Sequence, residues 1–539
     1  MSAQGAFTLV LHGHLPYMRL PGPYGEVTTY EILGDCYVPL LETLYDLKEA
    51  GIRYNLTLSL TPILVEQLTD DHDIEYFDHY LDEKIAAARR DRATFSSDDH
   101  PHIHFLAAWY ASHYEKIKLA FNQRFGRDLV GAFRRLQDEG YLEIITSAAT
   151  HAYLPLLGRD SAILGQLRTA VRSYQRAFER RPTGIWLPAC GYRPGLEKLL
   201  AAEGFRVFFC EPHMISGGPP IGIAAGDVLG PYATIKQLYA LPPAAPSPAG
   251  PATTRQSYLI EGSNVAVIGR DDHSTMQVWG IPLGYPGDVD YREYHRISGT
   301  SGLNYWRVTG PKIDPHDKDL YQPDWAAYKV DQHAEHFAHL IGDMIRAYHH
   351  QTGQFSLIAT ILDISLLGHW WFEGTRWLGE VLRHLAKTPE IELTSASRLI
   401  TDHPPQTSIA LAEGSWGIGG DHFIWDNPET RWLWEPMHAA EARMERLAGQ
   451  FTNPDEAART VLNQAARELL LMESGDWAVM IMTREDRRFA VQQFYRHLER
   501  FERLAASLEA GQPDRQLADA FWEVDKVFPD IDYRAFTKP

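Results

Sequence analysis

The sequence predicts an α/β protein built around a parallel sheet or barrel. Short apolar runs alternate with helix-like segments from the N-terminus to about residue 400. Polar and aromatic clusters follow several of the apolar runs, and the carboxyl ends of parallel strands are where such folds place their chemistry. After about residue 405 the pattern becomes mostly helical, which predicts a separate C-terminal helical domain.

The first half of the chain shows this alternation element by element. Residues 6–14 predict a strand, residues 37–51 a helix that ends on Gly51, and residues 53–62 a second strand. We expect a strand and loop over 142–155, the end of a strand running into a turn over 184–192, and a strand over 206–213. Helices are expected at 100–125, 129–140, 163–181 and 194–204.

Residues 214–262 interrupt the alternation. Their Pro/Ala-rich stretch, 242–254, predicts a surface loop within an insertion. A strand and helix over 264–280, a helix over 324–351, a buried strand with its loop over 355–374, and helices over 427–449, 453–481 and 488–511 follow. We therefore expect a barrel domain over 1–404, with an inserted subdomain at about 214–262, and a helical domain over 405–539.

Composition narrows the class of partner. The 539 residues include 51 Lys and Arg against 70 Asp and Glu, a net charge of −19, which argues against nucleic acid because phosphate binding needs clustered cations. Cys36, Cys190 and Cys210 have no CxxC spacing and fit a reducing compartment. The chain opens without a signal-peptide pattern and has no long apolar span. We expect a cytoplasmic monomer with no membrane partner.

Candidate site residues gather after the predicted strands. His12 and His14 end the first strand, and alternate residues of a strand point the same way, so both imidazoles are expected to face one site. Asp363 follows an apolar strand, where burial raises the pKa of a carboxyl group and suits it to general-acid work. The other candidates are His151, Trp186, Arg270, Trp279, His369, Trp370, Trp416, Trp425, Asp476 and Trp477. Each alone has a core or capping interpretation; their repeated occurrence in Gly/Asp/His/Trp loops favours a sugar-binding surface.

The sequence offers weak support for a metal. His333, His336 and His339 recur every three residues, a spacing that drifts around a helix, and no HExxH pattern accompanies them. We expect neither a metal ion nor a cofactor. The alternative is a metal-dependent barrel hydrolase, such as a polysaccharide deacetylase, that binds its ion through His12 and His14.

The motifs together resemble glycoside hydrolase family 57, and within it the 1,4-α-glucan branching enzymes. LHGHLPY (11–17), LEIITSAATHAYLPLLG (142–158), GIWLPACGYRPG (184–195) and LDISLLGHWWFEG (362–374) look like four family motifs in order. QVWGIPLGYPGD, YREYHR and EGSWGIGGDHFIWDN are similar to longer branching-enzyme signatures. The resemblance implies an incomplete (β/α)7 barrel, a small inserted domain and a helical C-terminal domain. It also implies a retaining transglycosylase acting on amylose or glycogen-like α-1,4-glucans.

The catalytic pair departs from the family pattern. The acid/base position matches Asp363, but the nucleophilic Glu that follows WLP in the family is Ala189, and a Glu two residues after the acid/base is Ser365. A retaining mechanism needs two carboxyl groups about 5–5.5 Å apart, and a methyl group cannot attack an anomeric carbon. The sequence therefore predicts an α-glucan-binding protein whose transglycosylase activity is impaired or absent.

Two alternatives to a natural loss of activity stay open. A Glu-to-Ala substitution made in a functional branching enzyme explains Ala189 but not Ser365. A displaced nucleophile is also conceivable, and Glu211, at the end of the next strand, is the candidate. Cys190 is expected on the opposite face of its strand.

Overall fold

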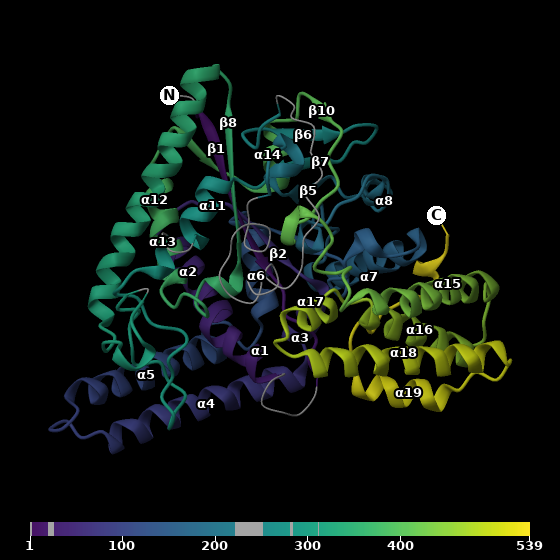
Figure 1. Cartoon of the computed structure of the whole chain (residues 1–539), viewed down its shortest axis with the longest axis horizontal. Coiled ribbons are helices and arrows are strands. Elements are labelled where there is room, and N and C mark those ends of the chain that lie inside the picture. Colours follow the sequence, from purple (N-terminus) through teal and green to yellow (C-terminus); the bar gives the residue numbers. More distant parts are fainter. Residues whose placement is uncertain (1–2, 20–25, 221–251, 281–283, 311, 539) are drawn as a thin grey trace. The chain divides into compact units, whose positions relative to one another are not determined.

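The computed structural model describes residues 3–19, 26–220, 252–280, 284–310 and 312–538 (Figure 1). Strands and helices alternate as predicted, so the α/β class is confirmed. The chain divides into two compact units. The first comprises Met1–Leu58, Gln67–Ile144 and Asp271–Ser395, and the second Ser59–Glu66, Ile145–Arg270 and Ala396–Pro539.

The first unit is built on β1 (Gly5–Gly13), a strand buried along its whole length. β1 pairs in parallel with β8 (Ser356–Asp363) and β9 (Ile391–Leu393), and β2 (Leu56–Leu60) lies beside it. The near-continuous apolar sequences of these strands suit a sheet covered on both faces. The register places His12 opposite Asp363, so two predicted site residues share one end of the sheet.

Helices surround this sheet. They are α1 (Glu26–Ile32), α2 (Val38–Glu49), α4 (Asp71–Thr94), α5 (Pro101–Leu119), α6 (Leu129–Asp138), α11 (Asp272–Trp279), α12 (Pro323–Thr352) and α13 (Gly374–Leu385). A π-helical turn, η1 (Leu33–Tyr37), joins α1 to α2. The sequence did not predict α4, which is rich in charge; it begins after the N-cap Asp70 and runs alongside α5 (Figure 1).

The second unit holds the remaining strands in the order β10-β6-β7-β5-β4-β3. Their bounds are β3 (Leu142–Ser147), β4 (Gly184–Trp186), β5 (Val207–Cys210), β6 (Ser257–Ile260), β7 (Ala266–Gly269) and β10 (Ser408–Ile409). The strand pairings described within this unit are parallel, except that of β6 with β7, which is antiparallel.

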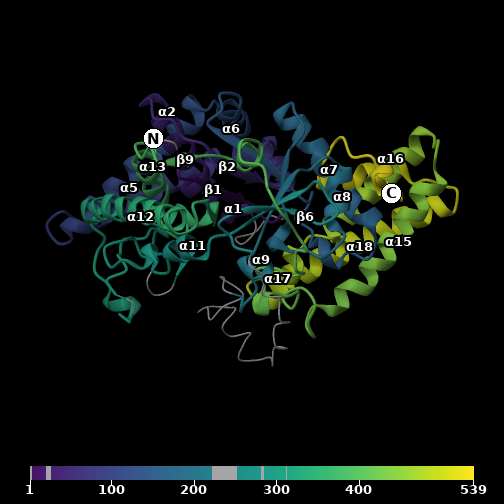
Figure 2. The ribbon, with the colours of Figure 1, turned by 90° about the horizontal axis from the view of Figure 1, so that it is seen from above.

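The helices of the second unit fall into two groups. α7 (Asp160–Phe178), α8 (Leu196–Ala202), α9 (Pro212–Ser216) and α14 (Ala396–Asp402) accompany the strands. α15 (Trp434–Gln450), α16 (Glu456–Met472), α17 (Asp476–Thr483), α18 (Arg487–Glu509) and α19 (Arg515–Val524) form the C-terminal part. Both views show α15, α16 and α18 side by side near the C-terminus (Figures 1 and 2).

Three expectations change in detail. Within 184–192, expected to be the end of a strand running into a turn, the strand ends at Trp186, and Pro188 and two left-handed residues then turn the chain. The helix predicted over 453–481 is two helices, α16 and α17, and the Gly475 N–H between them donates to the His151 carbonyl. Most of the expected insertion, residues 221–251, lies outside the described residues, and the domain boundary at 404 stays a prediction. Across the part of the chain that is described, none of the helices combines the length and apolar character that a bilayer-spanning segment requires.

Candidate active site

The histidines at the end of β1 lie together in the first unit. The ring centroids of His12 and His14 are 6.3 Å apart and their planes differ by 18°. His12 is buried and His14 half-buried. The alternation of a strand thus brings both imidazoles to one side, as the HxH spacing predicts.

Asp363, the last residue of β8, has the electrostatics of a general acid. Burial raises the pKa of its carboxyl group from 3.8 to about 6, and the charge of His14 acts in the opposite direction. A carboxyl group with this pKa keeps a substantial protonated fraction near pH 6, so it is suited to donating a proton to a departing sugar oxygen.

The HWW segment after β8 contains one exposed and one buried tryptophan. Trp370 is 46% exposed, whereas Trp371 is buried against Tyr285, Tyr291 and Trp377. His369 is buried, and its Nε2 lies 2.9 Å from the Tyr294 hydroxyl oxygen. Trp279 ends α11 and is half-buried. Of the two tryptophans, Trp370 is therefore accessible to a ligand, while Trp371 packs in the interior.

In the second unit, Ala189 sits in a strained turn. Its φ is 57° and that of Cys190 is 52°, a left-handed conformation that costs a non-glycine residue on the order of 1–3 kcal/mol. The Gly191 N–H donates to the Pro188 carbonyl at 2.9 Å and closes the turn. Because both residues lie in a turn, the strand-based expectation that Cys190 points to the opposite face does not apply. Both side chains are buried.

A glycine-rich loop, residues 413–427, holds this turn from the same unit. The Trp416 N–H donates to the Ala189 carbonyl at 2.9 Å, and Tyr192 and Gly414 exchange backbone hydrogen bonds. Trp425 stacks on Tyr153, with ring centroids 3.8 Å apart. The loop is thus a fixed support that keeps Trp416 beside the Ala189 turn.

Two further contacts fix the same loop. The Tyr153 hydroxyl lies 2.6 Å from His422 Nδ1, and His422 Nε2 lies 2.8 Å from a Glu413 carboxylate oxygen. Tyr153 and His422 were missed by sequence reasoning, although THAYLP and GGDHF contain them next to predicted site residues. No local pattern distinguishes them; only the folded contact does.

Several candidates of the second unit are engaged in the interior. Trp477 is buried and donates its indole N–H to the Leu471 carbonyl at 2.9 Å, and Trp425 and Trp186 are also buried. Asp476 accepts the Ser474 hydroxyl at 2.8 Å at the start of α17. His151 has a φ of 55° in the loop after β3. Of the predicted aromatics in this unit, Trp416 is the half-buried one that the loop presents beside the turn.

Arg270 and Glu211 form a buried ion pair. Arg270 donates from Nε to one carboxylate oxygen of Glu211 at 3.0 Å and from a terminal nitrogen to the other at 2.5 Å. This bidentate geometry is the strongest form of such a pair. The two side chains bind each other through these polar groups. This bears on the nucleophile role considered for Glu211 and on the sugar-binding role predicted for Arg270.

Comparisons with known proteins agree with this α/β architecture. The family model described as glycosyl hydrolase family 57 matches residues 8–260, and the model described as the C-terminal part of 1,4-alpha-glucan branching enzymes matches residues 436–536. A 1,4-alpha-glucan branching enzyme of Thermococcus kodakarensis is 37% identical over 97% of this chain and 77% of its own length.

Solved structures give the same result. The crystal structure of that enzyme, in complex with glucose, superposes with a TM-score of 0.90 at 35% identity, covering 99% of this chain and 97% of the other. A branching enzyme of Pyrococcus horikoshii gives 0.87 at 34% identity with the same coverage. An α-amylase of Thermotoga maritima gives 0.84 at 28% identity and covers 99% of both chains.

The chain is therefore an α/β protein with an incomplete (β/α)7 barrel and a C-terminal helical region, as predicted. It belongs to glycosyl hydrolase family 57, and it resembles the 1,4-α-glucan branching enzymes of that family.

Proposed function

We propose that this protein binds α-1,4-glucan at a branching-enzyme-like site and that its transglycosylase activity is impaired or absent. The observation that carries the proposal is Ala189, a buried residue in a strained left-handed turn at the position that matches the family's nucleophile. Strained backbone persists where the surrounding structure imposes it, and such positions cluster at functional sites. The backbone of the turn is strained in the way that functional sites often are, but the Ala189 side chain has no oxygen that could act as a nucleophile.

The retained parts support binding. Asp363 has the raised pKa of an acid/base, Trp416 is anchored to the Ala189 turn, and Trp370 exposes an aromatic face. Aromatic faces pack well against the flat C–H surfaces of sugar rings. Amylose and glycogen-like oligosaccharides are the proposed ligands, because relatives that cover nearly the whole chain are named as branching enzymes, one of them as a 1,4-alpha-glucan branching enzyme.

A displaced nucleophile at Glu211 is the less favoured alternative. A nucleophilic carboxylate must reach an anomeric carbon, yet both oxygens of Glu211 are held by Arg270 in the interior. Breaking a buried pair of this kind costs about 3–5 kcal/mol. The same pair holds the guanidinium of Arg270, whose predicted role is sugar binding.

The test is the substitution Ala189→Glu, with amylose as substrate and new α-1,6 linkages as the readout. We expect the wild-type protein to branch at least about 1,000-fold more slowly than Ala189→Glu, because restoring a nucleophile lowers the barrier by several kcal/mol. Ala189→Gln, which has the same shape without a nucleophilic oxygen, is the matched control and should stay inactive.

Two outcomes would overturn the proposal. Wild-type turnover equal to that of Ala189→Glu would show that another group acts as nucleophile, and mapping a trapped glycosyl adduct would find it. If no heat is exchanged when maltoheptaose is titrated into the wild-type protein, the proposed glucan-binding role is wrong.

A further inference from the structure

Asp35 is a buried carboxylate placed by an unusual backbone. It lies in η1 (Leu33–Tyr37), the π-helical turn between α1 and α2, and π-turns of this kind are frequent at functional sites. Burial raises the pKa of Asp35, but the neighbouring His369 imidazole and the charge of Arg292 outweigh it and hold the pKa below its ordinary value. Asp35 is therefore ionised inside the first unit, and its partners come from distant parts of the chain.

Gly368 lets the HWW segment approach this turn. A Cβ at Gly368 would lie 1.8 Å from the Asp35 carbonyl oxygen, and its φ of +126° also favours glycine. The Cys36 thiol lies 3.8 Å from the Ser365 carbonyl oxygen and adds a second contact between the two segments. The backbones are therefore in direct contact, which fixes where the next residue, His369, begins.

His369 lies between Asp35 and Tyr294. Its Nδ1 is 3.6 Å from a carboxylate oxygen of Asp35, and its Nε2 is 2.9 Å from the Tyr294 hydroxyl oxygen. A neighbouring carboxylate favours the proton on Nδ1, so Nε2 becomes the acceptor and the Tyr294 hydroxyl the donor. A hydroxyl whose proton is used in this way presents its oxygen to a ligand as an acceptor.

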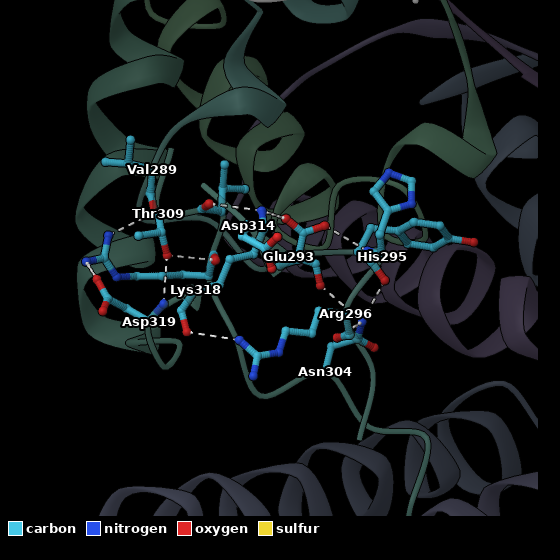
Figure 3. A network of polar contacts seen from close by, with 12 residues as sticks. Val289, Glu293, His295, Arg296, Asn304, Thr309, Asp314, Lys318 and Asp319 are labelled. Carbon is cyan, nitrogen blue, oxygen red and sulfur yellow. Dashed lines mark hydrogen bonds and ion pairs between the residues drawn. The ribbon is translucent and has the colours of Figure 1, made fainter. Parts of the chain in front are cut away.

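Tyr294 belongs to a segment that is held firmly. The Asn304 amide donates to the carbonyl oxygens of Glu293, Tyr294 and Arg296 at 3.0, 2.8 and 3.2 Å, and Figure 3 shows Asn304 facing this stretch. Lys318 pairs with the Glu293 carboxylate in the same network (Figure 3). Three backbone carbonyls tied to one amide leave the Tyr294 main chain little freedom.

Contacts of Arg292 also hold the segment that carries Tyr294. Arg292, two residues before Tyr294, is buried, and its guanidinium lies 4.0 Å from the centroid of the Phe372 ring. Its backbone N–H donates to Glu373 at 3.1 Å. The HWW segment is therefore in contact with η1 and also with the segment that carries Tyr294, and these two contacts fix the position of His369.

These contacts place the aromatic rings of Tyr294 and Trp370 next to each other. Tyr294 and Trp370 have ring centroids 4.4 Å apart and planes inclined by 43°; Trp370 is 46% exposed and Tyr294 half-buried. An exposed indole next to a phenolic oxygen offers one apolar face and one polar acceptor, the two features that a glucose ring recognises.

We propose that Tyr294 and Trp370 form a glucan subsite whose geometry Asp35 sets through His369, with Asp35 as a positioning residue. The proposal rests on the proposed function, because its ligand is the same α-1,4-glucan. Trp370 packs on the C–H face of a glucose unit, and Tyr294 accepts a hydrogen bond from one of its hydroxyl groups. Asp35 fixes the His369 tautomer and thereby the direction of the Tyr294 proton.

The first experiment is calorimetric titration of maltoheptaose into Tyr294→Phe, Asp35→Asn and the double variant of the full-length protein. We expect each single variant to bind about tenfold more weakly and the double variant no more weakly than the weaker single one, since residues of one chain of contacts are not additive. Tyr328→Phe, an exposed tyrosine on α12, is the matched control and should bind like wild type.

The second experiment reads the tautomer directly. In ¹⁵N-histidine-labelled protein, with His369→Gln used for assignment, the His369 ring should be the neutral Nδ1–H form, and Asp35→Asn should shift it toward Nε2–H. A merely structural role for Asp35 would lower thermal stability without this shift.

The outcomes separate the two proposals. A wild-type protein that binds maltoheptaose together with unchanged affinity in Tyr294→Phe overturns the subsite and leaves the proposed function standing. A wild-type protein that binds no glucan overturns both. An Nε2–H tautomer in the wild type overturns the positioning role of Asp35 whatever the affinity, and this holds even where Asp35→Asn fails to fold.

Discussion

Asp363 shows how burial sets the behaviour of a single carboxyl group. Its pKa rises to about 6 in the folded protein, against 3.8 for the free group. Ionising it inside the protein therefore costs free energy that the unfolded chain does not spend. Such a cost is tolerated where the group has a function, which agrees with the acid/base role proposed for Asp363.

The sign of the pH dependence follows. Below about pH 4 both states are protonated and Asp363 does not reduce stability. As the pH rises from about 4 to about 6, the unfolded state loses its proton first, so stability falls by at most about 3 kcal/mol and then levels off. We predict that Asp363→Asn is more stable than wild type at pH 7.5 and equal to it near pH 4.

Thermal melts from pH 4 to 8 test this prediction. Asp98→Asn removes an exposed carboxylate and is the control, with no comparable gain expected. A wild-type protein that gains stability relative to Asp363→Asn as the pH rises would show that Asp363 is paired with a cation in the folded state.

At the level of elements, the loop after β8 depends on one glycine. Gly368 touches the Asp35 carbonyl region of η1 so closely that no side chain fits, and its φ is +126°. The contact brings together residues more than 300 positions apart, and neither the π-turn nor the glycine signals it in the sequence. A glycine in GHWW reads as an ordinary loop residue until the fold is known.

Gly368→Ala should therefore destabilise the protein by about 3–5 kcal/mol, since a clash with backbone is added to the strain of the left-handed region. Gly353→Ala is the matched control: Gly353 ends α12 with a φ of +69° and open space around it, so only about 1 kcal/mol is expected. Urea unfolding of both variants measures the difference. Equal losses would mean that the loop moves away from η1 at little cost.

At the level of the whole molecule, a glucan-binding protein and a metal-dependent hydrolase predict opposite effects of glucan and of a chelator on the Tm. If the protein is glucan-binding, maltoheptaose at 100 times its dissociation constant should stabilise the folded state by about 2.7 kcal/mol and raise the Tm. A chelator should leave the Tm unchanged. A fall in Tm with EDTA, and no rise with glucan, would instead favour a metal-dependent hydrolase that uses His12 and His14.

The sequence was informative about the order of elements. Strands at β1, β3, β5, β7 and β8 and the long helix α12 were anticipated, because apolar runs and helical periodicity are local properties. The charged helix α4 was missed, since its stability comes from packing against α5 and from an N-cap rather than from a strong apolar stripe. The strand and the turn within 184–192 were anticipated, but the left-handed conformation of Ala189 and Cys190 was not, because it has no sequence signal when neither residue is glycine.

The structure places the predicted site residues in different surroundings, and their roles stay predictions. His12, His14 and Asp363 lie together at the end of β1 and β8, and His369 contacts Trp370 in the segment after β8. Trp477 is buried and bonded to a backbone carbonyl, and Arg270 forms a bidentate pair with Glu211. Tyr294 and Asp35 were overlooked. Tyrosines and acids are common, and only the partners they find distinguish these two.

By itself, the sequence determined the α/β class, the family resemblance and the chemical gap at Ala189, because each is written in the identity and local spacing of residues. Only the tertiary structure decided which side chains are available to a ligand. Burial, the Glu211–Arg270 pair and the Asp35–His369–Tyr294 contacts all join residues distant in the chain. Their energies depend on distance and desolvation, and both quantities exist only after folding.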